Sequence, residues 1–184
     1  MANFKDSPHF AIHDDYYTPE SAWKQISHII PDGESGKIIW EACMLGAEQS
    51  KSPQHIASGG GSWYEEENVV YDTTMNCLEN QPDKWDMIIT NIPFDKEKKI
   101  PILKKFVKYD KPFITLMNSC NLYSNYMKEI FGENIKHLQV IHPRGKINYL
   151  KLENGEVKKT KNCSFYSVYV CYKMNLDTED LWIL

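Results

Sequence analysis

Short apolar runs alternate with amphipathic stretches along most of this chain. Four apolar runs have the length and composition of buried strands: 37–40, 68–71, 86–89 and 112–117. Four other stretches carry apolar residues at helical spacing or the boundary signals of a helix: 18–30, 52–58, 98–109 and 122–131. The first of these helices is expected to start with the Thr18 hydroxyl as N-cap and Pro19 at the first helical position. Regular alternation of this kind predicts an α/β fold.

The last third of the sequence changes character. Residues 137–141, 146–152 and 165–172 are strand-like with no helix between them, and a turn at 153–155 or a longer loop joins the last two. We therefore predict a mostly parallel central sheet with an antiparallel C-terminal edge. Open sheets of this type bind nucleotides beyond the carboxyl ends of their strands, near the switch point in strand order. The strand-end residues Glu41, Asp72 and Asn91 are the first candidates for a site.

Size and composition limit the remaining choices. The 184 residues, 21.5 kDa in mass, are expected to form a single domain, 1–184. The five cysteines are odd in number and include no CxxC pair, and no histidine pair has metal-ligand spacing, so neither a disulfide framework nor a metal site is predicted. No signal peptide and no membrane-spanning apolar run is evident. The expected location is the cytoplasm.

Charge is distributed unevenly. The chain has a net charge of -4, yet residues 144–161 hold six basic and only two acidic residues. A solvated hairpin would have this composition, and so would a surface that meets a phosphate backbone. The candidate nucleic-acid contacts are Arg144, Lys146, Lys158, Lys159 and Lys161.

A four-residue motif follows the apolar strand at 86–89. It reads Asn91-Ile92-Pro93-Phe94 and resembles motif IV of the S-adenosylmethionine-dependent amino-methyltransferases, usually written [DNS]-P-P-[FYW]. The likeness is to small phage-type and bacterial DNA adenine-N6 methyltransferases and extends over residues 14–174. It implies a Rossmann-like class I methyltransferase fold, S-adenosylmethionine as the cofactor, and Asn91, Ile92, Pro93 and Phe94 as the catalytic residues.

The chemistry implied for the motif follows from the weakness of an exocyclic amine as a nucleophile. Asn91 Oδ1 and the Ile92 carbonyl would accept the two N6 hydrogens, which localises the nitrogen lone pair and aims it at the methyl group. Pro93 would hold the turn rigid, and Phe94 would stack on an adenine taken out of its duplex or from a single strand.

Further segments resemble the cofactor motifs of the same family in the same order. Tyr17, Thr18 and Pro19 resemble the segment that closes over the cofactor carboxylate. Glu41, Cys43 and Gly46 resemble the loop around its methionine part. Asp72 has the place of the acid that binds the ribose hydroxyls. Asn76 has the place of the residue that reads the adenine.

The sequence differs from the family pattern at four points. Gly46 is the only glycine of a loop that normally has two, Ala42 and Ile92 replace prolines, and Asn76 replaces aspartate. A catalytically inactive descendant that serves as a binding or assembly module is therefore an alternative to the enzyme.

The substrate and partners also have alternatives. DNA is the expected substrate, and RNA is the rival because the NIPF spelling resembles that of ribosomal-RNA adenine dimethyltransferases. Glutamine in a protein is a third substrate of the same motif. The apolar tail at 181–184 is expected to dock on the chain's own core or to contact a second copy or a partner subunit.

Overall fold

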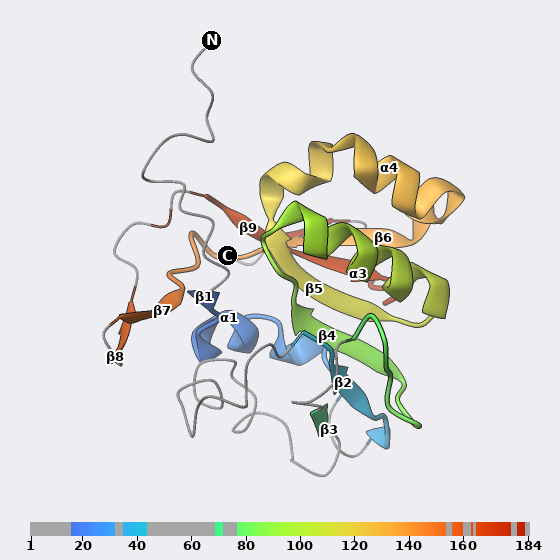
Figure 1. The fold of residues 1–184 in the computed structure, drawn as a ribbon, viewed down its shortest axis with the longest axis horizontal. Coiled ribbons are helices and arrows are strands. Elements are labelled where there is room, and N and C mark those ends of the chain that lie inside the picture. The colour runs from blue at the N-terminus through green and yellow to red at the C-terminus, as the bar shows by residue number, and fades with distance from the viewer. Residues whose placement is uncertain are drawn as a thin grey trace.

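The computed structural model describes residues 16–31, 35–43, 69–71, 77–153, 156–159, 163, 165–177 and 180–182. A seven-stranded sheet with the order β10-β6-β9-β5-β4-β2-β3 forms its centre (Figure 1). Its strands are β2 (Ile39–Glu41), β3 (Val69–Tyr71), β4 (Met87–Asn91), β5 (Phe113–Asn118), β6 (Leu138–His142), β9 (Ser167–Tyr172) and β10 (Asp180–Trp182).

The strand directions confirm the predicted Rossmann-like α/β fold. β3, β2, β4 and β5 are parallel neighbours, and β9 is antiparallel to both β5 and β6. The expected antiparallel edge is, however, displaced inward. β9 lies inside the sheet, and β10 forms the edge, where the backbone of residues 180–182 pairs in parallel with β6. The sequence pattern does not predict this order, because β9 inserts between β5 and β6, and both of these strands come earlier in the chain.

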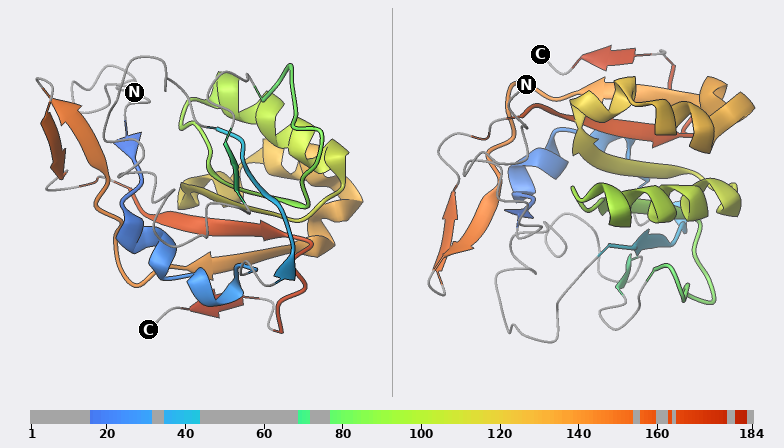
Figure 2. Two further views of the ribbon diagram at one scale, coloured as in Figure 1. Left: turned by 90° about the horizontal axis from the view of Figure 1, so that it is seen from below. Right: turned by 45° about the horizontal axis from the view of Figure 1, so that its top comes forward.

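Each face of the sheet packs against different helices (Figures 1 and 2). Alternate strand residues such as Ile88 and Phe113 join the core under α3 (Lys96–Tyr109) and α4 (Asn125–Phe131). Their neighbours in sequence, such as Ile89 and Ile114, face the other way and join the core under α1 (Glu20–Lys24) and the 3-10 helix η3 (Ser27–Ile29). The continuous apolar runs are explained by this burial on both faces.

Helix boundaries follow the sequence with shifts of a few residues. Asp95 caps α3 by accepting a hydrogen bond from the Glu97 N–H at 2.9 Å, and the helix ends at Asp110 in the left-handed region. Two 3-10 helices, η7 (Ser119–Tyr123) and η8 (Gly132–His137), flank α4. The predicted N-cap at Thr18 is wrong. α1 begins at Glu20 with Pro19 in the cap position, and no side chain caps it.

A second, three-stranded sheet contains β1 (Tyr16–Tyr17), β7 (Leu150–Glu153) and β8 (Glu156–Lys159). β7 pairs antiparallel with β8, a strand that the sequence did not predict, and not with the strand at 165–172. β1 pairs with the other edge of β7. The predicted helix at 52–58 lies outside the described residues. Within the part of the chain that the structure describes, no helix is long and apolar enough to span a membrane.

Candidate active site

The carboxyl ends of β2 and β4 lie side by side at the point where the strand order reverses. After β2 the chain adds β3 on one side of it, and it then returns to add β4 and β5 on the other side. Crevices at such a switch point are where open α/β sheets bind ligands. Glu41 ends β2 and Asn91 ends β4, so the fold brings these two predicted residues to the same edge.

Thr90 connects the two strand ends. Its buried hydroxyl donates a hydrogen bond to Glu41 Oε1 at 3.0 Å and accepts one from the Cys43 N–H, also at 3.0 Å. One side chain on β4 thus fixes the acid that ends β2 and the turn that follows it. The sequence reasoning missed Thr90, although a hydroxyl that ends a buried apolar run and directly precedes the motif was a usable signal.

Burial alters the acidity of Glu41. Desolvation raises the pKa of its carboxyl group to about 7, while the hydrogen bond from Thr90 lowers the pKa and offsets part of that effect. The carboxyl group therefore gains or loses its proton near neutral pH. A cation beside it would favour the ionised form.

The two middle residues of the tetrad 91–94 are buried, and its two end residues are partly exposed. Ile92 is 0% exposed in the core under α3, and its N–H donates to the Leu116 carbonyl at 3.4 Å. Pro93 is buried as well, whereas Asn91 and Phe94 are partly exposed. Asn91 Oδ1 is buried and has no hydrogen-bond partner among the described residues. A buried carbonyl oxygen without a partner costs free energy, and a ligand N–H would remove that cost.

Phe94 belongs to an aromatic cluster on the opposite face from Ile92. Its ring meets Tyr149 edge-on with the centroids 5.5 Å apart and lies 5.0 Å from the ring of Phe165. The Tyr149 hydroxyl shares a hydrogen bond with Ser167 Oγ at 2.7 Å, which fixes the edge partner of Phe94. These contacts hold the Phe94 ring beside the strand end.

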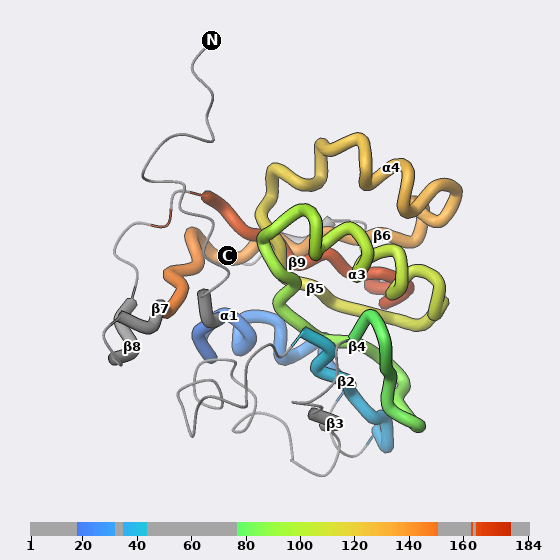
Figure 3. Tube along the Cα trace, in the orientation of Figure 1, coloured from blue at the N-terminus to red at the C-terminus, as the bar shows by residue number. Residues whose placement is uncertain are grey.

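α3 starts at Lys96, two residues after Phe94, and the chain trace in Figure 3 leads from β4 into this helix. Lys99, one turn into the helix, is only 3% exposed, and its Nζ donates to Asn121 Oδ1 at 3.2 Å. The Tyr126 hydroxyl donates to the same oxygen at 2.6 Å. This network ties the start of α3 to η7, which follows β5 at the same edge of the sheet. No local sequence pattern indicates this network, because the three residues come from separate elements.

The segment that precedes α1 is described in part. Thr18 is 3% exposed, and its Oγ1 is another buried atom without a partner among the described residues. Tyr17 pairs through its backbone with Leu150 of β7. The predicted residues Gly46, Asp72 and Asn76 lie outside the described residues, so their roles remain predictions.

The basic segment begins at the same edge of the sheet as the tetrad. β6 runs parallel to β5, so Arg144 and Lys146 follow its carboxyl end, and both are exposed. Lys146 Nζ lies 4.6 Å from the centroid of the Tyr166 ring, which is 60% exposed. The backbone of Lys158 and Lys159 lies in β8, and Lys161 is outside the described residues. At least two of the predicted nucleic-acid contacts thus share an edge with Asn91.

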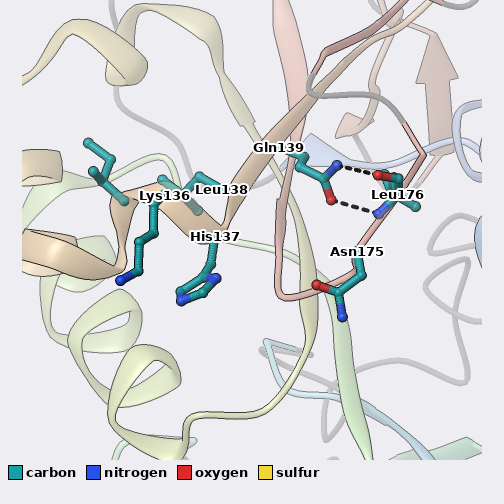
Figure 4. Close-up of a pocket in the computed structure, with 7 residues that line it drawn as sticks. Lys136, His137, Leu138, Gln139, Asn175 and Leu176 are labelled. Carbon is teal, nitrogen blue, oxygen red and sulfur yellow. Dashed lines mark hydrogen bonds between the residues drawn. The ribbon is translucent and has the colours of Figure 1, made fainter.

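A cavity of about 690 Å³ opens at the opposite edge, between η8 and the segment after β9 (Figure 4). The Gln139 amide beside it is paired in both directions with the Leu176 backbone, with both hydrogen bonds at 2.9 Å. Because Leu138 begins β6, this cavity is at the amino edge of the sheet and takes no part in the site at Glu41 and Asn91.

No protein-family model matches the sequence, and no curated protein matches it either. Among solved structures, a SAM-dependent O-methyltransferase from Thermotoga maritima shares 13% identity at a TM-score of 0.37, and the match covers 86% of this chain and 66% of that one. A precorrin-6y C5,15-methyltransferase from Geobacter metallireducens GS-15 shares 14% identity at 0.39, over 88% and 97% of the two chains. This chain therefore spans just under two thirds of the first structure, and likenesses of this size assign it neither an activity nor a ligand.

Proposed function

We propose that this chain transfers a methyl group from S-adenosylmethionine to the exocyclic N6 amine of adenine in DNA. The observation that carries the proposal is Asn91 Oδ1, a buried acceptor without a partner among the described residues, at the carboxyl end of β4. The oxygen belongs to a tetrad that resembles motif IV of adenine-N6 methyltransferases, and it lies at the switch point of the sheet, where ligands of such folds bind.

The residues at the neighbouring strand end fit the proposed cofactor. When bound, S-adenosylmethionine supplies an electrophilic methyl group on a sulfonium. Glu41, held by Thr90, offers a carboxylate to the ammonium of its amino-acid moiety, and this charge partner would offset the burial that raises the pKa of Glu41. Thr18 Oγ1 offers a further buried polar atom in the segment that resembles the one closing over the cofactor carboxylate.

The tetrad fits the amine. Asn91 Oδ1 and the Ile92 carbonyl each accept one N6 hydrogen, so the nitrogen lone pair is withdrawn from the ring and can point at the methyl carbon. The buried Ile92 and Pro93 keep the two acceptors fixed, which lowers the cost of orienting the amine. No general base is needed before transfer, because the methylated amine is acidic and loses its proton to water afterwards.

The surroundings of the tetrad favour nucleic acid as the substrate. Arg144 and Lys146 offer positive charge to phosphates at the same edge of the sheet, and the exposed Tyr166 ring beside Lys146 offers a surface on which a base can stack. Phe94 is positioned by Tyr149 and Phe165 for the stacking role that the family resemblance implies. DNA is preferred to RNA because the likeness over residues 14–174 is to DNA enzymes.

The test is a methyl-transfer assay with tritiated cofactor on unmethylated DNA and on RNA of the same sequence, combined with calorimetry of cofactor binding. We expect label in adenine of DNA. Label in RNA alone would replace DNA by RNA as the substrate. Absence of cofactor binding up to millimolar concentration would refute the enzyme and support the alternative of a non-catalytic binding or assembly module.

A further inference from the structure

Two tyrosine rings are exposed to solvent at the edge of the sheet that bears the tetrad. Tyr123 is 89% exposed and ends η7, the 3-10 helix that follows the carboxyl end of β5. Tyr166 is 60% exposed and directly precedes β9, which is antiparallel to β5 and therefore starts at the same edge. Among the described residues, these are the two most exposed large hydrophobic side chains. Aromatic rings gain free energy when they are covered, so both are candidates for contacts with a ligand.

Hydrogen bonds fix the backbone that carries the two rings. The Ser119 N–H donates to the Tyr166 carbonyl at 2.8 Å, which joins the start of η7 to the residue before β9. The Asn118 side chain caps η7 by accepting from the Cys120 N–H at 2.9 Å. The Asn121 amide donates to the Asn118 carbonyl at 2.7 Å, and its oxygen belongs to the network that ties η7 to α3 and α4. A surface that is already ordered loses less conformational entropy when it binds a partner.

Positive charge lies beside both rings. Lys146 Nζ is 4.6 Å from the centroid of the Tyr166 ring. On the other side, the exposed Lys96 begins α3, and its Nζ is 5.7 Å from the centroid of the Tyr126 ring, three residues after Tyr123 in the chain. Surfaces that bind single-stranded nucleic acid combine these two features, because bases stack on the aromatic rings and cations meet the phosphates.

We propose that the substrate is DNA in single-stranded form, and that Tyr123 and Tyr166 stack on the bases that flank the target adenine. The inference rests on the proposed function and narrows its substrate. In a duplex each base is covered on both faces by its neighbours, so only an unpaired strand offers base faces to rings on a protein surface. A single strand also presents its adenine to the tetrad without the free energy of unpairing.

Binding titrations of the full chain test the preference and the role of Tyr123. The probe is a fluorescently labelled thymidine oligomer with one central adenine, used as a single strand or annealed to its complement at the same salt concentration. By anisotropy, we expect about tenfold tighter binding of the single strand, and about tenfold weaker binding of it by Tyr123→Ala. Tyr123→Phe keeps the ring and should bind like wild type.

Ile135→Ala is the control for loss of an exposed apolar side chain, because Ile135 lies in η8 at the opposite edge of the sheet. It should leave both affinities unchanged. Since Tyr123 is almost fully exposed, its variants should also unfold at the wild-type temperature, which thermal denaturation verifies.

The proposal is overturned if wild type binds the two DNA forms equally, if Tyr123→Ala binds the single strand like wild type, or if an RNA single strand of the same sequence binds more tightly than DNA. Methyl transfer in the same samples separates this inference from the proposed function. Transfer to DNA with no effect of Tyr123→Ala on binding would refute the stacking surface and keep the enzyme. A single-strand preference that depends on Tyr123, without any methyl transfer, would keep the surface and refute the enzyme.

Discussion

The Thr90 hydroxyl forms hydrogen bonds with both Glu41 and Cys43, and it therefore positions two of the residues predicted to bind the cofactor. Replacing it by valine removes the donor to Glu41 and the acceptor of the Cys43 N–H. We expect Thr90→Val to weaken S-adenosylmethionine binding about tenfold and to move the pKa of Glu41 further upward, since the lost bond stabilised the carboxylate. Thr90→Ser keeps the hydroxyl and is the matched control. Calorimetric titrations of the three proteins would contradict this role if Thr90→Val bound like wild type.

Glu41 makes stability depend on pH in an unusual direction. Its pKa is about 7 in the folded protein and 4.5 in the reference state, so between these values the folded chain binds more protons than the unfolded chain. The contribution of Glu41 to the free energy of unfolding is therefore most favourable below about pH 4.5. As the pH rises from there through 7, the free energy of unfolding falls by an amount on the order of 3 kcal/mol. Glu41→Gln cannot ionise and should lack this loss. Urea unfolding of both proteins across the window measures the difference, and parallel pH profiles would contradict the assigned burial.

At the level of elements, the junction between β4 and α3 holds the tetrad. Asp95 caps α3 immediately after Phe94, and its side chain accepts from the Glu97 N–H. Asp95→Ala should lower the free energy of unfolding by about 1 kcal/mol, whereas Asp95→Asn keeps an acceptor and should lose only a few tenths of that. Chemical denaturation of the two variants provides the measurement. Equal loss in both would show that the carboxylate charge, and not the cap, stabilises the junction.

The elements also show how far a sequence predicts this molecule. Strands β2 to β5 and helix α3 were predictable because each strand is a continuous apolar run and the helix has apolar residues at helical spacing. The cap at Thr18 was wrong because tertiary packing buries this residue, and α1 starts one position later than predicted. β8 was missed because its alternation is masked by lysines. The order β5-β9-β6 could not be predicted, because strand order depends on contacts between distant segments.

The candidate site was predictable to a similar extent. Asn91 and Glu41 were found because they end buried strands, and the fold brings them to one edge. Thr90 itself had a local signal as a hydroxyl next to the motif, but the contacts that it makes, like that of Lys99 with Asn121, join separate elements and depend on the fold.

At the scale of the whole molecule, the net charge of -4 means that the proposed binding of DNA requires a local basic surface. We propose that this surface begins with Arg144 and Lys146, at the edge that bears Asn91. We expect DNA affinity to fall as salt rises, and the double variant Arg144→Gln, Lys146→Gln to reduce the slope of log K against log salt by about 2. Lys24→Gln and Lys173→Gln, both outside the basic segment, are controls. An unchanged slope in the double variant would remove this segment from the interface.

The proposed methyl transfer depends most on the acceptor at the end of β4. The decisive measurement is the yield of N6-methyladenine in DNA, obtained by mass spectrometry of digested nucleosides, for wild type and Asn91→Ala proteins whose cofactor affinities have been matched by calorimetry. We expect product from wild type and a loss on the order of 10²-fold in Asn91→Ala with cofactor binding retained. Equal yields from the two proteins, or no methylated adenine from a wild-type protein that binds the cofactor, would contradict it.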